Sequence, residues 1–351
     1  MHFLMAFSLA LLLVVALRPL GRKFGIYDVP DRRKNHNRPV LVIGGIAMVV
    51  AFKTSIHILG PVPESVSFMM LAVAITCVVG LIDDLYHLSS KSLFATQILA
   101  ALIVIWFGGT EVQNLGDLFG FGNIHTGPLT MAFTLICVLG VINAVNMSDG
   151  ADGLAGFLVL ISSSWFAVLA YLTNMLFLFE ISLVLMGVVL GFLAFNMRHP
   201  WRRQASIFMG NAGSLSLGLL MTWFAVELSG KLDSPVTPIT AVWVIAMPLL
   251  DMCRVMVSRI RQGKSPFVAD HLHLHHMLSS VGYSVGQVVA IKGFVSFAMG
   301  AVGVGAWYIG VPEWVMFYGF VVTLGLYFYL LGSGWRHVCH IIERRRLVSR
   351  S

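Results

Sequence analysis

The amino-acid sequence predicts an all-α integral membrane protein, a polytopic bundle of about eleven transmembrane helices. Three observations support this prediction: the scarcity of charge, the recurrence of long apolar segments, and the sorting of basic residues between loops. Of the 351 residues, 58% are hydrophobic and only 11% are charged, and the mean hydropathy is +0.85. An ordinary soluble domain carries about 25% charged residues, so the composition excludes a soluble globule, and it excludes a disordered chain as well.

The apolar segments are long enough to span a lipid bilayer, which takes about 20 residues in helical form. They alternate with short polar connections along the chain. We identify them as residues 3–20, 40–60, 66–82, 93–108, 128–146, 154–173, 178–197, 213–229, 235–257, 286–308 and 313–332. The Gly-rich stretch 109–127 is expected to form a loop or a small hairpin on the external side of the membrane.

The basic residues divide sharply between the two sides of the predicted bundle. Twenty of the 23 Lys and Arg residues fall in alternate connections and the C-terminal tail, namely in 18–39, at Lys91, in 198–203, in 254–264 and in 336–350. Cytoplasmic loops carry an excess of Lys and Arg, so we assign these connections to the cytoplasm. The N-terminus is then outside and the C-terminus is cytoplasmic, as an odd number of spans requires.

Two adjacent carboxylates, Asp83 and Asp84, stand at the cytoplasmic end of the third apolar segment. Such a pair is mutually repulsive and costly to remove from water. Acidic residues at the edge of a membrane span are therefore functional candidates by default. The pair indicates a site for a divalent cation or for phosphate, with a pair of solvated interface charges as the alternative.

A second polar cluster follows the fifth apolar segment. Asn143 and Asn146 are three residues apart, and so are Asp149 and Asp152, a spacing that puts each pair on one face of a helix. Hard oxygen ligands of this kind suit Mg²⁺, which usually retains several waters and is shared with substrate phosphates. Capping of a helix end by Asn and Asp is the structural alternative.

Two further stretches add candidate ligands for an anionic substrate. The Gly-rich sequence around Asn211 precedes a span, and such turns present backbone N–H groups to anions. The candidates between 259 and 276 combine basic side chains with imidazoles, which bind diphosphate, orient a sugar or shuttle protons; they are Arg261, Lys264, His273, His275 and His276. A zinc site is disfavoured because no Cys lies near these His residues.

Asp, Asn, His and basic residues thus meet at one face of the predicted bundle. Phosphoryl transfer needs positioned phosphates, a metal ion and donors for the developing charge. The combination favours a phosphotransferase between a soluble diphosphate donor and a lipid phosphate. A transporter for lipid-linked sugars is the alternative from another class, but transporter sites lie near the bilayer midplane. Nucleic-acid binding has no support, since the Lys and Arg residues lie in short loops near the membrane.

Six stretches of the sequence are similar to one known family, the polyprenyl-phosphate N-acetylhexosamine-1-phosphate transferases. They read GIYDVPDRRKNH, LIDDLYHLSSK, INAVNMSDGADGLAG, FMGNAGSLSLG, SRIRQGKSPFVADHLHLHH and VPEWVMF, and they extend from about residue 25 to residue 317. The H-x-H-H form at His273, His275 and His276 resembles the members that transfer GlcNAc-1-phosphate. The related transferases of the muropeptide donor have consecutive His residues.

The resemblance implies one multi-span transferase domain over residues 1–351 in the bacterial inner membrane. Its catalytic loops would be 83–92, 146–153, 198–213 and 258–285, on the cytoplasmic face. It implies UDP-GlcNAc as donor, undecaprenyl phosphate as acceptor and Mg²⁺, or Mn²⁺, as cofactor. The product would prime O-antigen or another cell-surface polysaccharide. Another UDP-sugar or the muropeptide donor stays open as an alternative, as does a homodimer.

The resemblance also assigns roles to individual residues. Asp83, Asp84, Asp149 and Asp152 match the catalytic acidic residues, and the three His residues match the substrate-binding element. We expect Lys91, Asn143, Asn146, Arg261 and Lys264 to contact substrate as well. The predicted metal ligands are Asp83, Asp84, Asp152 and Asn211. The family usually has Asp where this chain has Asn211, and the loss of one charge predicts weaker Mg²⁺ binding.

Overall fold

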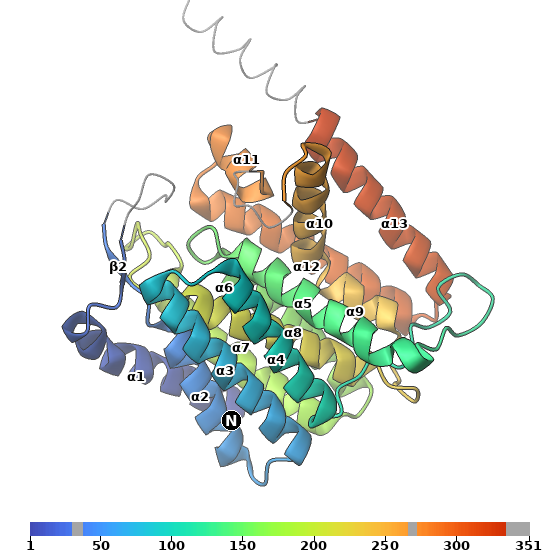
Figure 1. Cartoon of the computed structure of the whole chain (residues 1–351), viewed down its shortest axis with the longest axis horizontal. Helices are drawn as coiled ribbons and strands as arrows, with labels where there is room; N and C mark the ends of the chain where they lie inside the picture. Colours follow the sequence, from blue (N-terminus) through green and yellow to red (C-terminus); the bar gives the residue numbers. More distant parts are fainter. Residues whose placement is uncertain (30–37, 266–271, 335–351) are drawn as a thin grey trace, which may run out of the picture.

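The computed structural model describes residues 1–29, 38–265 and 272–334, and this part of the chain is almost entirely helical (Figure 1). Its helices are α1 (His2–Lys23), α2 (Gly44–Leu59), α3 (Glu64–Tyr86), α4 (Ser90–Trp106), η1 (Gly127–Leu129), α5 (Thr130–Ser148), α6 (Leu154–Leu172), α7 (Leu176–Asn196), α8 (Gly210–Ser229), α9 (Pro238–Val244), α10 (Ala246–Arg261), α11 (Leu274–Ser280), α12 (Val285–Tyr308), α13 (Glu313–Tyr329) and η2 (Leu330–Gly334). Two short strands, β1 (Tyr27–Asp28) and β2 (Val40–Leu41), pair antiparallel.

Every predicted apolar segment coincides with helical structure, which confirms the all-α membrane bundle. Among the described residues, eight helices are long and apolar enough to cross a membrane, and α9 with α10 makes a ninth if the two count as one bent span. Helices α2 and α4 are apolar but shorter, with 16 and 17 residues. The total of eleven crossings and the orientation of the termini stay predictions.

The apolar segment 235–257 is divided between two helices, which count as one span only if the bend is included. Helices α9 and α10 meet at an angle of 81°. Pro248 explains the break, because its ring lacks an N–H and clashes with the carbonyl group four residues earlier, that of Val244. Helix α10 therefore leaves the bundle on the side where α11 and one end of α12 and α13 also lie (Figure 1).

The connections contain structure that the sequence predicts only in part. The loop 109–127 forms the expected small hairpin, in which the N–H of Leu115 donates to the Ile124 carbonyl at 2.9 Å. The β1–β2 pair and the short helix α11 are not predicted. The basic stretch 31–36, Asp270 and the basic residues of 336–350 lie outside the described residues.

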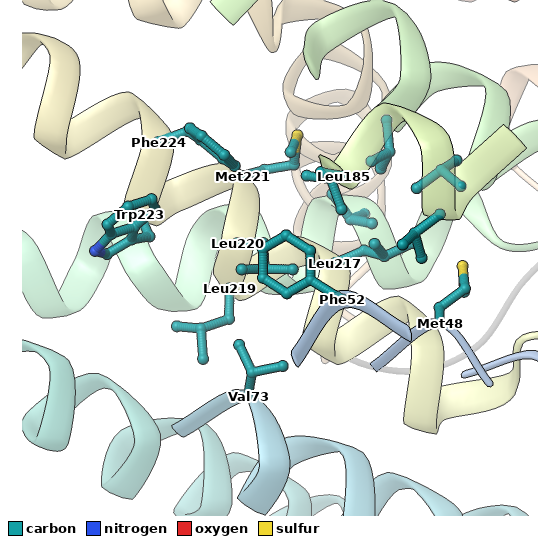
Figure 2. Close-up of a cluster of buried hydrophobic side chains, with 14 of the residues drawn as sticks. Met48, Phe52, Val73, Leu185, Leu217, Leu219, Leu220, Met221, Trp223 and Phe224 are labelled. Atoms are coloured by element: carbon teal, nitrogen blue, oxygen red, sulfur yellow. The ribbon is translucent and has the colours of Figure 1, made fainter. Parts of the chain in front are cut away.

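Helix α8 forms the centre of the bundle, and nearly all of its side chains are buried. Figure 2 shows Leu217, Leu220 and Phe224 of this helix among apolar side chains from α2, α3 and α7. In a water-soluble protein, burial of each such side chain stabilises the folded state by roughly 1.5–3 kcal/mol. Inside a membrane, close packing rather than water exclusion holds helices together.

Glycine residues let two neighbouring helices approach the start of α8 closely. A Cβ atom at Gly80 of α3 would lie 2.5 Å from the backbone nitrogen of Ala212. A Cβ atom at Gly45 of α2 would lie 2.3 Å from the backbone nitrogen of Gly213. Small residues at such contacts are typical of membrane helix packing, and here they bring α2 and α3 into backbone contact with the first turn of α8.

We expect Gly80→Ala to lower thermal stability, because the added methyl group must displace the backbone of α8. Overpacking of this kind costs about 1–3 kcal/mol. Gly140→Ala in α5 is the matched control, since nothing lies within 4 Å of the added methyl group there. Unfolding of the purified protein in detergent, followed by tryptophan fluorescence, measures both. Equal melting temperatures for the two variants would contradict the close approach of α3 and α8.

Candidate active site

A cavity of about 830 Å³ lies where the ends of several helices meet. The C-terminal ends of α3, α5 and α7 contribute to its lining, and so do the N-terminal ends of α8 and α12 and the turn before α6. All these ends therefore lie at one end of the bundle. Small-molecule sites commonly have volumes of about 300–1,000 Å³, so the cavity is large enough for a sugar nucleotide.

The lining of the cavity is strongly acidic. Its ionisable residues are Asp28, Asp83, Asp84, Asp149, Asp152, Arg198, His87, His275 and His276. Five carboxyl groups thus face one guanidinium. Such a surface repels a bare diphosphate and attracts a divalent cation with hard oxygen ligands.

The Asp84 carboxylate accepts hydrogen bonds from the first backbone N–H groups of α8. The N–H of Asn211 donates to it at 2.9 Å and the N–H of Ala212 at 3.2 Å. An acidic group is stabilised at a helix N-terminus, where N–H groups lack partners and the helix dipole is positive. The sequence predicts that this Gly-rich turn presents N–H groups to an anion, and in the structure they bind the protein's own carboxylate.

Gly210 makes that contact possible. Its φ is +63°, a left-handed conformation that favours glycine. A Cβ atom at this position would lie 2.2 Å from the Asp84 carboxylate.

The Asn211 side chain connects two of the predicted site residues. Its amide nitrogen donates to Asp83, and its carbonyl oxygen accepts a hydrogen bond of 2.7 Å from Asn146. Asn146 also donates to Ser214 at 2.8 Å. The amide N–H at position 211 therefore stabilises the negative charge of Asp83. An Asp at this position would instead repel that charge.

Asp152 is held differently from the other acidic residues. Its Oδ2 accepts hydrogen bonds from Arg198 at 2.7 Å and from the N–H of Ala205 at 3.1 Å. Asn196 at the end of α7 fixes the same turn, because it accepts from the N–H of Gly153 and donates to the Ile207 carbonyl. The turn that carries Asp149 and Asp152 is thereby tied to the connection between α7 and α8.

Asp149 lines the cavity and is exposed to that space, with chain segments around it on all sides. These surrounding segments, together with the negative charges of Asp84, Asp152 and Asp28, raise the pKa of Asp149 to about 7. In the described part of the chain its carboxylate accepts no hydrogen bond from another side chain. A carboxyl group with a pKa near neutrality is suited to proton transfer.

His275 lies in the wall of the cavity, and within the described residues neither of its ring nitrogens is hydrogen-bonded, although the side chain is buried. Burial, followed by the nearby Lys292 ammonium, lowers the pKa of His275 to about 2, so the ring is neutral. Nε2 lies against Gly150, where a Cβ atom would approach it to 2.2 Å. Buried polar groups are normally paired, and a neutral ring without a partner is a candidate ligand for a polar substrate group.

Eight of the predicted site residues meet at or beside this cavity: Asp83, Asp84, Asn146, Asp149, Asp152, Asn211, His275 and His276. The other five lie elsewhere. Lys91, Arg261 and Lys264 are exposed outside the cavity lining, and the Asn143 amide donates to Gln97 of α4 at 2.7 Å. His273 is buried and turned toward Asp251.

The structure adds lining residues that the sequence reasoning does not select. Asp28 belongs to the connection 18–39, whose basic residues indicate membrane orientation, and β1 brings this acidic residue to the cavity. His87 is the left-handed residue that ends α3. Arg198 and Asn196 are assigned to membrane orientation or to a helix end, and no spacing in the sequence signals their contacts with the 149–153 turn.

In the part of the chain that the structure describes, two groups of residues could hold a metal ion. Asp251, His273 and His275 have ligand atoms within 4.8 Å of one another. However, the Lys292 ammonium already lies 2.9 Å from the Asp251 carboxylate and opposes a second cation. The acidic cavity fits a hard divalent cation better, and Asp83, Asp84 and Asn211 contact one another there.

Gly150→Ala tests the placement of His275, because the added methyl group would collide with its ring. We expect the activity that the sequence resemblance implies to fall by about 10²-fold, the scale of a displacement near 1 Å in an active site, while the melting temperature changes little. Gly286→Ala is the control, since it lies beside the cavity and its methyl group meets nothing within 4 Å. Full activity of the Gly150→Ala protein would show that His275 does not lie against this turn.

Comparison with known proteins identifies the family. The profile of glycosyl transferase family 4 matches residues 66–229. The undecaprenyl-phosphate α-N-acetylglucosaminyl 1-phosphate transferase of Escherichia coli strain K12 is 31% identical over 94% of this chain and 90% of its own length. The proteins of the same name from Yersinia pestis and Haemophilus influenzae are 30% and 29% identical, over 97% of this chain and over 93% and 96% of their own lengths. The chain therefore belongs to glycosyl transferase family 4, and it is similar along nearly its whole length to transferases that act on undecaprenyl phosphate.

Proposed function

We propose that this protein transfers GlcNAc-1-phosphate from UDP-GlcNAc to undecaprenyl phosphate, giving undecaprenyl-diphosphate-GlcNAc and UMP. The observation that supports this most is the acidic cavity at the helix ends, built by the residues that the family resemblance selects. The names of the similar proteins supply the acceptor and the sugar. Residues 1–351 act as one transferase domain, with 83–92, 146–153, 198–213 and 258–285 as its catalytic connections.

Mg²⁺, or Mn²⁺, is the cofactor in this proposal. Asp83, Asp84 and Asn211 would hold it, with Asp152 as the fourth predicted ligand, although Oδ2 of Asp152 is already bound to Arg198. When bound, the ion neutralises the diphosphate and stabilises charge on the leaving phosphate. Arg198 supplies the only guanidinium among the described lining residues and is placed to contact a phosphate oxygen.

The reaction is a direct displacement in which an oxygen of the lipid phosphate attacks the β-phosphorus of the donor. The bond between that phosphorus and the bridging oxygen breaks, and UMP leaves with the oxygen. Asp149 accepts a proton from the lipid phosphate, since its carboxylate is not engaged by another side chain and its pKa is near 7. The neutral His275 ring forms a hydrogen bond with the sugar nucleotide, either through its N–H or through its other ring nitrogen. A covalent aspartyl intermediate is the alternative, and it predicts a phosphorylated protein in the absence of lipid phosphate.

The active site faces the cytoplasm of a bacterial cell, in the inner membrane. The basic connections near Lys91 and Arg198 are on the same side as the cavity, and cytoplasmic loops are rich in such residues. UDP-GlcNAc is a cytoplasmic metabolite that does not cross membranes, so an active site on this face reaches its donor directly.

Sealed membrane vesicles test the reaction and the face together. Inverted vesicles that contain the protein receive radiolabelled UDP-GlcNAc, undecaprenyl phosphate and Mg²⁺, and we expect label in the organic phase. Right-side-out vesicles should give none. Asp149→Asn should reduce transfer at least about 10²-fold, as expected for loss of a general base, whereas Asp233→Asn, at an exposed residue, should not.

Each outcome of this assay has one meaning. Transfer only in right-side-out vesicles would reverse the orientation and leave the transferase intact. Transfer from another UDP-sugar would replace the donor. Absence of transfer with every UDP-sugar, in the wild type and after Asn211→Asp, would overturn the proposed function.

Asn211→Asp tests the metal site. The change removes the donor to Asp83 and adds a charge, so without divalent metal the variant should unfold at a lower temperature than the wild type. Mg²⁺ should raise its melting temperature more than that of the wild type. The Mg²⁺ concentration for half-maximal activity should fall about tenfold. This is the lower end of the range by which changes close to a metal ion alter its affinity.

Asn143→Asp is the matched control, since it makes the same change on α5 outside the cavity lining. Its Mg²⁺ dependence should equal that of the wild type. Coincident Mg²⁺ titrations for Asn211→Asp and the wild type would show that position 211 does not face the metal.

A further inference from the structure

A buried ion pair connects helices α10 and α12 beside the cavity. The Lys292 ammonium of α12 donates to Oδ2 of Asp251 in α10 at 2.9 Å. Lys292 is fully buried and Asp251 is 1% exposed. Removing one partner of such a pair strands an uncompensated charge, whereas replacing both by apolar residues is often tolerated. The pair by itself is therefore weak evidence for a role in stability.

The second oxygen of Asp251 has a different set of partners. Oδ1 accepts a hydrogen bond of 3.1 Å from the backbone N–H of Leu274, the first residue of α11, and another of 3.1 Å from the Tyr327 hydroxyl of α13. Nδ1 of His273 lies 3.4 Å from Oδ2. One carboxylate thus collects donors from α12, α13 and the segment that leads into α11, which lie together in Figure 1.

This contact fixes the residues that reach the cavity. His275 follows Leu274 by one position, and its ring lies 5.5 Å from the ring of His273 and 4.1 Å from that of His276, between ring centroids. On its other side it meets Gly150. No hydrogen bond from residues 1–29, 38–265 or 272–334 fixes the His275 ring itself, so its place in the wall depends on how the backbone around Leu274 is held.

We propose that Asp251, with its charge balanced by Lys292, is a positioning residue that fixes the segment His273–His276 against the 149–153 turn. His273 is then an anchor of this segment to the membrane helices and not a ligand for substrate. The functional consequence rests on the proposed transferase reaction, in which His275 contacts the donor. The placement of the segment His273–His276 does not rest on that reaction, and it can be measured separately.

Two double variants separate the ion pair from the anchor. Asp251→Leu with Lys292→Met removes both charges and every acceptor for Leu274. Asp251→Asn with Lys292→Met also removes both charges, but it keeps a carbonyl oxygen that accepts from Leu274 and Tyr327. Neither double variant strands a buried charge, so both should fold, and a thermal unfolding curve of the full chain in detergent checks this.

Reaction of His275 with diethyl pyrocarbonate is the readout that needs no activity. The reagent modifies neutral imidazoles that it can reach, and mass spectrometry of peptides measures each His separately. We expect His275 to react at least about tenfold faster in the Leu–Met variant, the factor that corresponds to 1.4 kcal/mol, and at the wild-type rate in the Asn–Met variant. The exposed His57 is the internal reference for the dose of reagent.

Kinetics of the folded variants give the second readout. In the Leu–Met variant kcat/KM for the sugar nucleotide should fall about 10–100-fold, as when an outer-shell partner is lost, with a rise in KM. The Asn–Met variant should retain most of kcat/KM. Equal modification of His275 in both variants and the wild type would overturn the proposal. If His275 reacts as expected and no protein transfers sugar phosphate, the anchor stands and the proposed function fails.

A third variant decides the case in which both double variants unfold. Leu274→Pro removes only the backbone N–H that donates to Asp251 and leaves the ion pair intact, and Pro is tolerated at the first position of a helix. Faster modification of His275 in this variant would support the anchor, and an unchanged rate would overturn it.

Discussion

The hydrogen bonds between Asp84 and the first turn of α8 determine the geometry of the cavity. Helix α8 is enclosed by its neighbours, and the glycine contacts of α2 and α3 leave its first turn no room to shift. Asp84 stands on one of those neighbours and binds the N-terminus of α8 directly. The side chains of Asp83 and Asn211 are then brought together by the packing of the bundle and not by a flexible loop. A site built on rigid helices holds its groups more accurately than one built on loops.

The balance of charge in the cavity indicates how the substrate enters. Carboxyl groups outnumber the guanidinium five to one among the described lining residues. A diphosphate that enters such a space must bring cations or find them there. Asn211 reduces this imbalance by one charge compared with an Asp at the same position, and its amide gives Asp83 a neutral partner. The site of this protein is therefore less repulsive in the absence of metal than a site with Asp at that position.

The sequence predicts the part of the fold and of the site that follows from local patterns. Apolar segments predict the helices, and acidic residues at segment ends predict Asp83, Asp84, Asp149 and Asp152 as a cluster. It does not predict the contact of Arg198 with Asp152, because that contact depends on how α7 meets the turn before α6. Nor does the sequence predict which of the three His residues line the cavity. His273 faces Asp251 while His275 and His276 line the cavity, and that division depends on the tertiary packing of a short segment.

The ion pair between Asp251 and Lys292 also has a consequence for how the protein enters the membrane. A lysine in the interior of a transmembrane helix costs about 2.5–3.5 kcal/mol to insert when it lies at the centre of the bilayer. Lys292 is the eighth of the 24 residues of α12, so only part of this cost applies to it, and its counter-charge is on α10, which is synthesised earlier. An α10 helix that is already in place therefore favours stable integration of α12.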